Sequence, residues 1–227
     1  MPTDRVGRAD CRRWLRILNR EERRRAERFR FEQDRRDFIA AHALLRQMLT
    51  FHLGEAAERW QFAKGEFGKP KLAEAYRQSA IDFNLSHTRD LVAAAVVAHG
   101  TVGVDVEQIN PAKADFEVAQ RYFAAAEVEL LRRTPAPERP ACFFRLWTLK
   151  EAYLKATGAG LGTPLDSFAF ALEPIRIGFL PSTHDDPRRW QFAAPPTTGR
   201  HMLSLAVTGF GNRAVRVVPR AIAAREL

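Results

Sequence analysis

The segment 101–108, TVGVDVEQ, is the part of this sequence that most restricts how the chain can fold. Because successive side chains of a β-strand point to opposite faces, its three valines share one face, and Asp105 and Glu107 share the other. The two acids lie about 7 Å apart along the strand, given the usual rise per residue. Such a strand must bury its valine face and must offset the repulsion between its paired carboxylates. Gly103 lies on the acidic face and leaves room beside them.

Helix-like and strand-like patterns follow each other twice along the chain. The predicted helices span 19–29, 33–53, 115–122, 125–133 and 141–157. The predicted strands lie at 60–62, 81–85, 91–98, 101–108, 167–172, 176–180, 190–192, 202–208 and 214–218. The pentapeptide RWQFA also occurs twice, at 59–63 and at 189–193. These patterns predict an α+β fold of two similar halves joined near residues 100–110, and the junction is a natural place for a ligand.

Composition limits the class of protein. The chain has 227 residues with 46% hydrophobic content, which is enough to form a core. The longest purely apolar run, 91–98, is too short to span a bilayer, and the first ten residues lack the apolar segment of a signal peptide. Two cysteines, Cys11 and Cys142, make no disulfide framework. We therefore predict a soluble, cytoplasmic protein without a membrane partner.

The formal net charge of +9 predicts anionic partners. Basic residues are concentrated at 20–30, REERRRAERFR, which is also explained as a solvated helical face of mixed charge. A basic nucleic-acid-binding module is the competing class, and charge is its only support. The acids interleaved in this segment argue against a nucleic-acid-binding arm.

The predicted helix at 141–157 supplies a third acid. Trp147, Glu151 and Lys155 are spaced i, i+4 and i+8 and lie along one face. Taken alone, Glu151 is explained as a surface residue paired with Lys155. Together with the strand acids, it forms a set of three carboxylates from two elements, which suits a hard divalent cation such as Mg²⁺. A bound cation would also offset the repulsion between the strand acids.

Other chemical motifs are absent or incomplete. The glycine-rich segment 158–162 follows a helix and lacks Rossmann spacing, and the chain contains no GxxxxGK[ST] phosphate loop. The six histidines form no HExxH pair. Ser86 and His87 lack the flanking glycines of a nucleophile elbow, and on sequence alone they are explained as turn residues.

Three blocks resemble the signature motifs of the 4′-phosphopantetheinyl transferases: FNLSHT at 83–88, GVDVE at 103–107 and WTLKEAYLKATGAGLGTPLDSF at 147–168. The second block followed by the WxxKEAxxKxxGxGL pattern of the third is the most specific combination. With GKP at 68–70, the blocks spread across most of the chain. In length and order they resemble the monomeric, surfactin-synthetase-activating type.

This resemblance implies a pseudo-dimer of two similar α+β halves, each with helices packed on a mainly antiparallel sheet. The halves would be residues 1–101 and 102–227, with the metal-binding acids in the second half and the active site between the halves. The implied reaction transfers the phosphopantetheine group of coenzyme A to a serine of an acidic apo acyl or peptidyl carrier protein. It releases 3′,5′-ADP, depends on Mg²⁺ and involves no nucleic acid. A coenzyme-A-binding scaffold without catalytic activity is a further alternative.

The resemblance also implies roles for individual residues. Asp105, Glu107 and Glu151 match the metal-binding acids, and Glu127, Glu151 and Lys155 match catalytic residues. Contacts with coenzyme A are implied for Arg25, His42, Lys69, Pro70, Ser86, His87, Asp105 and Lys155.

Two of these assignments leave alternatives open. Glu127 matches a proposed catalytic base, but it is also explained as a glutamate favoured at a helix start, with a metal-bound water as the base. His42 stands where relatives commonly have an arginine at the 3′-phosphate, and arginine carries a permanent charge that histidine does not. Arg25 and Arg28 lie where family members place other basic residues near that phosphate.

Overall fold

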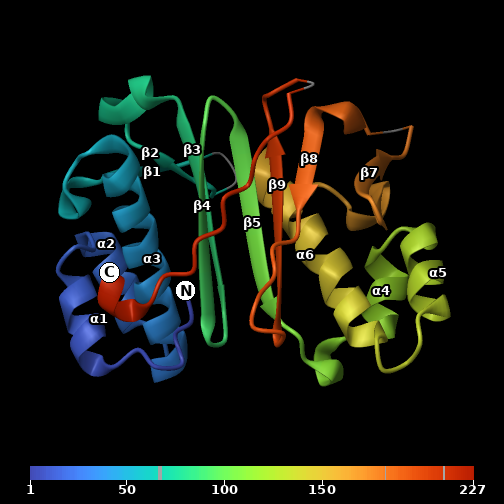
Figure 1. The fold of residues 1–227 in the computed structure, drawn as a ribbon, viewed down its shortest axis with the longest axis horizontal. Coiled ribbons are helices and arrows are strands. Elements are labelled where there is room, and N and C mark those ends of the chain that lie inside the picture. Colours follow the sequence, from blue (N-terminus) through green and yellow to red (C-terminus); the bar gives the residue numbers. More distant parts are fainter. Residues whose placement is uncertain (66–67, 182, 212) are drawn as a thin grey trace.

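The computed structural model describes residues 1–65, 68–181, 183–211 and 213–227 (Figure 1). The first half contains three α-helices followed by strands in two antiparallel pairs, β1–β2 and β3–β4. The elements are α1 (Arg8–Leu15), α2 (Arg20–Glu27), α3 (Glu32–Leu53), β1 (Phe62–Lys64), β2 (Pro70–Leu72), β3 (Ile81–Thr88) and β4 (Leu91–Ala98).

The second half begins with the strand that carries the paired acids. Its elements are β5 (Thr101–Gln108), α4 (Phe116–Tyr122), α5 (Ala125–Arg133), α6 (Arg139–Thr157), β6 (Phe168–Leu172), β7 (Ile175–Phe179), β8 (Trp190–Ala193) and β9 (His201–Thr208). Strand β9 lies between β5 and β8 and is antiparallel to both, and β6 pairs with β7. The predicted α+β fold with helices on mainly antiparallel sheets is therefore confirmed.

Local sequence signals explain several element boundaries. The Asn19 side chain accepts a hydrogen bond from the Glu22 N–H (2.9 Å), and the Glu22 carboxylate accepts one from the Asn19 N–H (2.7 Å), so α2 begins with a capping box. Helix α3 ends at Gly54, whose φ of 77° lies in the left-handed region that glycine adopts without strain. Both signals are visible in the sequence.

Three segments differ from the sequence prediction. Helix α1 was not predicted, because it starts at Gly7 without a side-chain cap and buries only Trp14. Strand β2 was not predicted either. The predicted strand at 214–218 is irregular, because the side chain of Gln191 binds the backbone there: it accepts from the Val215 N–H (2.8 Å) and donates to the Arg213 carbonyl (2.7 Å).

Helices α1, α2 and α3 lie on one side of the molecule and α4, α5 and α6 on the other, with β3, β4, β5 and β9 between them; β7 lies farther out, beyond β8 (Figure 1). Helix α3 packs on β3 and β4, and α6 packs on β5 and β9. The end of the chain returns across the strands to α1, where the Arg13 side chain donates to the Ala224 carbonyl (2.9 Å). Among the described residues, no helix combines the length and the apolar character that a bilayer crossing requires.

The two halves meet along a ladder of side-chain-to-backbone hydrogen bonds between β3 and β5. Every second side chain of β3 accepts from a backbone N–H of β5 exactly 20 residues later. The four pairs are Asp82 with Val102 (2.8 Å), Asn84 with Val104 (2.9 Å), Ser86 with Val106 (3.3 Å) and Thr88 with Gln108 (3.2 Å). Because side chains alternate along a strand, one face of β3 supplies all four acceptors. We call this set of contacts the β3–β5 ladder.

The acidic face of β5 is turned toward α6. A side chain at Gly103 would place its Cβ 2.0 Å from the carbonyl oxygen of Ala152 and 2.5 Å from the backbone N of Ala156. Only a residue without a Cβ permits this close approach of strand and helix. Gly103 thus brings the α6 side chains next to the carboxylates, whereas the valine face of β5 is buried against β4 and β9.

Candidate active site

The strand acids lie beside the α6 lysine at the junction of the halves. Asp105 is buried, and its Oδ1 accepts from Lys155 Nζ (2.6 Å) and Ser86 Oγ (2.9 Å). Glu107 is half-buried, and its Oε2 accepts from Thr88 Oγ1 (3.2 Å). The geometry thus brings together groups from β3, β5 and α6, which are far apart in the sequence.

The three predicted metal-binding acids influence one another electrostatically. Burial, and then the charge of Asp105, raises the pKa of Glu107. The same two causes, in the same order, raise the pKa of Glu151. The side chain of Glu151 makes no hydrogen bond or ion pair with any described residue. A cation among these carboxylates would relieve their mutual repulsion.

One buried oxygen atom, Oδ2 of Asp105, is suited to bind a metal ion. Asp105 Oδ2 is buried and has no hydrogen-bond partner among the described residues, and an unsatisfied buried carboxylate oxygen is costly unless it finds a ligand. However, no three His, Cys, Asp or Glu side chains of the described ranges stand as a ready-made metal cluster. Cation binding at this site would therefore draw the three carboxylates closer together.

Basic side chains gather next to the acids. Burial, followed by the charges of His42, Lys155 and Arg25, lowers the pKa of His87 to about 4. The Arg25 guanidinium lies 5.4 Å from the centre of the Phe38 ring, and the ring centre of His42 lies 4.2 Å from that of Phe38. The structure therefore places four of the predicted coenzyme A contacts, Arg25, His42, His87 and Lys155, around one region.

His42 has an acidic partner of its own. Its Nδ1 lies 3.0 Å from Glu22 Oε1, while the other oxygen of Glu22 pairs with the buried Arg46 (2.7 Å). Glu22, in the first turn of α2, thus connects α2 to α3. Whether His42 contacts a phosphate stays a prediction.

Lys69 and Pro70 occupy a different setting from the basic cluster. Lys69 Nζ pairs with Asp82 (2.6 Å) and donates to the Val102 carbonyl (2.9 Å), so this lysine ties β3 to β5 at the first rung of the β3–β5 ladder. Pro70 opens β2 opposite Lys64. The predicted contact of both residues with the nucleotide stays a prediction.

Glu127 is fully enclosed in the second half. Its Oε2 accepts from the Ala124 N–H (3.0 Å) and pairs with Lys150 Nζ (2.8 Å), and its Oε1 accepts from the Phe170 N–H (2.9 Å). Burial is the largest cause of its raised pKa, which the charge of Lys150 opposes. These contacts match the interpretation of Glu127 as a residue that starts α5, and its role as catalytic base stays a prediction.

The sequence analysis missed Thr88, Asn84 and Asp82 as parts of this junction. The signal was present: the segment IDFNLSHT alternates apolar or histidine residues with Asp, Asn, Ser and Thr. Four polar residues on one face of a strand are normally read as solvent-exposed. Here that face meets the edge of β5, which only the tertiary structure reveals.

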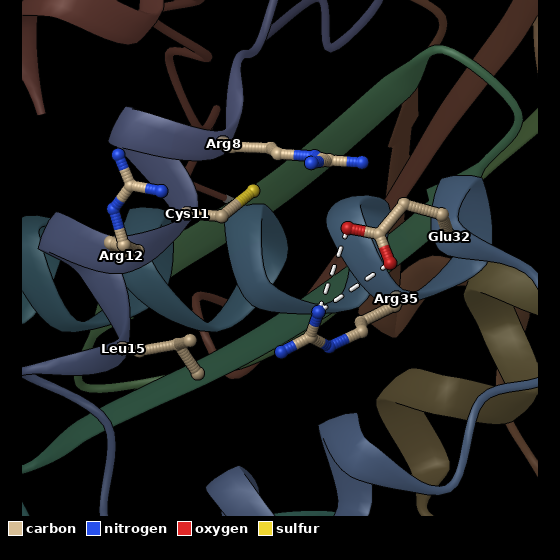
Figure 2. Close-up of a pocket in the computed structure, with 6 residues that line it drawn as sticks. All are labelled: Arg8, Cys11, Arg12, Leu15, Glu32 and Arg35. Carbon is tan, nitrogen blue, oxygen red and sulfur yellow. Dashed lines mark hydrogen bonds and ion pairs between the residues drawn. The ribbon is translucent and has the colours of Figure 1, made fainter.

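A cavity of about 440 Å³ lies between α1 and α3 (Figure 2). It is lined by Arg8, Cys11, Arg12, Leu15, Glu32 and Arg35, and none of the predicted site residues is among them. At the edge of the cavity, the Arg35 guanidinium forms an ion pair with the Glu32 carboxylate (3.4 Å; Figure 2). This cavity therefore does not mark the predicted active site.

Most of this chain is similar in sequence to known proteins. Residues 101–206 match the 4′-phosphopantetheinyl transferase superfamily, and residues 6–99 match the N-terminal region of a 4′-phosphopantetheinyl transferase. The 4′-phosphopantetheinyl transferase HetI of Nostoc sp. is 36% identical over 86% of this chain and 80% of its own length. The 4′-phosphopantetheinyl transferase Sfp of Bacillus subtilis is 28% identical over 70% of this chain and 69% of its own.

Among solved structures, the holo-[acyl-carrier-protein] synthase of Thermotoga maritima aligns with 48% of this chain and 62% of its own, with 22% identity and a TM-score of 0.38. A similarity of that size carries no argument by itself. The matches over both halves and the identity to HetI are sufficient, and they confirm the resemblance noted in the sequence. This chain belongs to the 4′-phosphopantetheinyl transferase superfamily and is a transferase of that family.

Proposed function

We propose that this enzyme transfers the 4′-phosphopantetheine group of coenzyme A to a serine of an apo carrier protein in a Mg²⁺-dependent reaction, releasing 3′,5′-ADP. The observation that carries the proposal is the buried Oδ2 of Asp105, which has no hydrogen-bond partner among the described residues and lies beside Lys155 and the group of Arg25, His42 and His87. A carboxylate site for a cation next to basic groups for phosphates is the arrangement that a pyrophosphate substrate requires.

The roles of the side chains follow from their positions. Asp105, Glu107 and Glu151 would hold the magnesium ion, which when bound supplies positive charge against the pyrophosphate. Lys155 would donate to the pyrophosphate, and its contacts with Asp105 and Ser86 hold its ammonium group in place. Positioning and electrostatic stabilisation are the main contributions of a protein to phosphoryl transfer.

The serine that attacks the phosphorus must lose a proton, and the candidate acceptors are Glu127 and a water held at the cation site. Both carboxylate oxygens of Glu127 already accept hydrogen bonds, and its side chain is fully buried. Glu151 has a role as a ligand of the cation, and a carboxylate that binds a cation is a weak proton acceptor. The contacts of Glu127 therefore favour a water at the cation site as the acceptor.

The carrier is proposed to be acidic, because the enzyme has a formal net charge of +9. Opposite charges increase the rate of encounter and are screened by salt. We therefore expect the apparent KM for the carrier to rise with ionic strength more than the KM for coenzyme A. A carrier KM that is the same at low and high salt would contradict electrostatic steering.

A cytoplasmic location and a monomeric state of the enzyme belong to the same proposal.

The binding of coenzyme A in calorimetry tests the proposed site. We expect Mg²⁺ to tighten the binding of coenzyme A to the wild-type enzyme, because the ion and the pyrophosphate share the carboxylate site. The increment should disappear in Glu151→Gln, which keeps the size of the side chain and removes its charge. Equal binding by the wild-type enzyme with and without Mg²⁺ would remove the metal from the proposal.

The substitution His42→Arg tests the position of the 3′-phosphate. An arginine adds a permanent charge and a planar set of donors next to Arg25, so we expect about 10-fold tighter binding of coenzyme A, the size of one charge-assisted hydrogen bond. Dephospho-coenzyme A, which lacks the 3′-phosphate, is the matched control and should bind about equally to both proteins. An equal gain for the two ligands in calorimetry would place His42 away from this phosphate.

A further inference from the structure

Thr88 at the end of β3 connects the β3–β5 ladder to one of the strand acids. Its Oγ1 accepts a hydrogen bond from the Gln108 N–H and lies 3.2 Å from Glu107 Oε2. A threonine hydroxyl has one proton and two acceptor positions. Because an ionised carboxylate can only accept hydrogen bonds, the hydroxyl donates its proton to Glu107 while it accepts from the backbone N–H. The hydroxyl thus fixes both the orientation of Glu107 and the position of the backbone next to it.

Ser86 makes the same pair of contacts two residues earlier. Its Oγ accepts from the Val106 N–H (3.3 Å) and from Lys155 Nζ (3.0 Å), and it donates to Asp105 Oδ1 (2.9 Å). Each hydroxyl of β3 therefore binds the side chain of the residue 19 positions later and the N–H of the residue 20 positions later. The repeat arises because β3 and β5 run side by side in the same direction and side chains alternate along both.

The other two rungs provide a contrast. The Asn84 side chain accepts from the Val104 N–H (2.9 Å), and the side chain it would meet 19 positions later is absent, because that residue is Gly103. Asn84 supports the β3–β5 ladder without touching an acid. Asp82 is occupied by Lys69 and the Val102 N–H. Hydroxyl-bearing residues thus stand at the two rungs that face Asp105 and Glu107.

We propose that Ser86 and Thr88 are positioning residues, whose hydroxyl groups hold Asp105 and Glu107 in the orientation that binds the divalent cation. The proposal rests on the proposed function, in which these acids are metal ligands. Hydrogen bonds to ligating carboxylates fix their orientation, and loss of such a bond commonly weakens metal binding about 10- to 100-fold. Thr88 is the residue to test, because Ser86 also contacts Lys155 and is itself a predicted coenzyme A contact.

The experiment compares Thr88→Val with Thr88→Ser by titrating each protein with Mn²⁺ alone and following free Mn²⁺ by electron paramagnetic resonance. Valine keeps the shape of threonine and removes the hydroxyl, so the dissociation constant should rise about 10-fold. Serine keeps the hydroxyl and should bind Mn²⁺ like the wild type. Urea unfolding of each variant checks that it is folded at the titration temperature. A Thr88→Val protein with wild-type Mn²⁺ affinity would overturn the proposal.

Two further variants show whether a negative result refutes the positioning role of Thr88 or the metal site itself. Asn84→Ala removes a rung of the β3–β5 ladder that touches no acid, so it should lose stability but keep its Mn²⁺ affinity. If Asn84→Ala weakens Mn²⁺ binding as much as Thr88→Val, the ladder acts as a whole and the role of the hydroxyl is refuted. Glu107→Gln should weaken Mn²⁺ binding. If it does not, the metal site of the proposed function is wrong; if it does while Thr88→Val has no effect, only the positioning role is wrong.

Discussion

Replacing Asp105 with asparagine is expected to lower the rate of phosphopantetheine transfer about 100- to 1,000-fold, the usual effect of removing one electrostatic contact from a transition state. Among the described residues, Asp105 is the acid that combines a contact with Lys155 and a buried oxygen without a hydrogen-bond partner. Asparagine keeps the size of the side chain and an oxygen that accepts from Lys155 and Ser86. The loss of activity should therefore come from the lost charge.

The same substitution should leave the fold intact. Asp105 raises the pKa of both Glu107 and Glu151, so its removal relieves a repulsion that opposes folding in the absence of metal. Urea unfolding should show a stability close to that of the wild type. Glu129→Gln, on an exposed residue of α5, is the control for loss of an acid elsewhere. Transfer by Asp105→Asn at the wild-type rate in limiting Mg²⁺ would refute the role of Asp105.

The second large effect is expected on stability, from Glu127→Gln. The side chains of Glu127 and Lys150 are 0% and 1% exposed and pair at 2.8 Å. Removal of one partner leaves a buried charge without compensation, which typically costs about 3–5 kcal/mol in the free energy of unfolding. Lys150 also donates to two backbone carbonyls, and those contacts hold it in place rather than allowing it to reach solvent.

The double variant Glu127→Gln, Lys150→Met is the matched comparison. Because it removes the stranded charge, it should unfold at a higher urea concentration than Glu127→Gln alone. A Glu127→Gln protein as stable as the wild type would contradict the buried ion pair. The pH–rate profile tests the catalytic base separately: if Glu127 takes the proton, the acid limb disappears in Glu127→Gln, and if a metal-bound water does, the limb remains.

Elements that the sequence predicts correctly are those defined by short-range signals. The start of α2 follows from the reciprocal contacts of Asn19 and Glu22, which are three residues apart. The alternation of 101–108 follows from the geometry of one strand and places Asp105 and Glu107 on the same face. The sequence indicated that Gly103 leaves room beside these acids, and the structure shows that α6 occupies that room.

Features that depend on another part of the chain were not predicted. The 214–218 segment is irregular because the side chain of Gln191, more than 20 residues earlier in the sequence, binds its backbone. The polar alternation of β3 is indistinguishable from that of a solvent-facing strand until β5 lies against it. The buried ion pair of Glu127 likewise depends on Lys150 of α6. In each case a distant group, rather than local propensity, determines the outcome.

The measurement that tests the central claim most directly is the intact mass of apo carrier proteins after incubation with the enzyme, coenzyme A and Mg²⁺. The panel should include acyl and peptidyl carriers, each with a control in which the modified serine is alanine. We predict a mass gain equal to one phosphopantetheine group on at least one carrier, with 3′,5′-ADP released in equal amount. The gain should be absent without Mg²⁺ and in the serine-to-alanine control. An unmodified panel in the presence of folded enzyme, coenzyme A and Mg²⁺ would contradict the account.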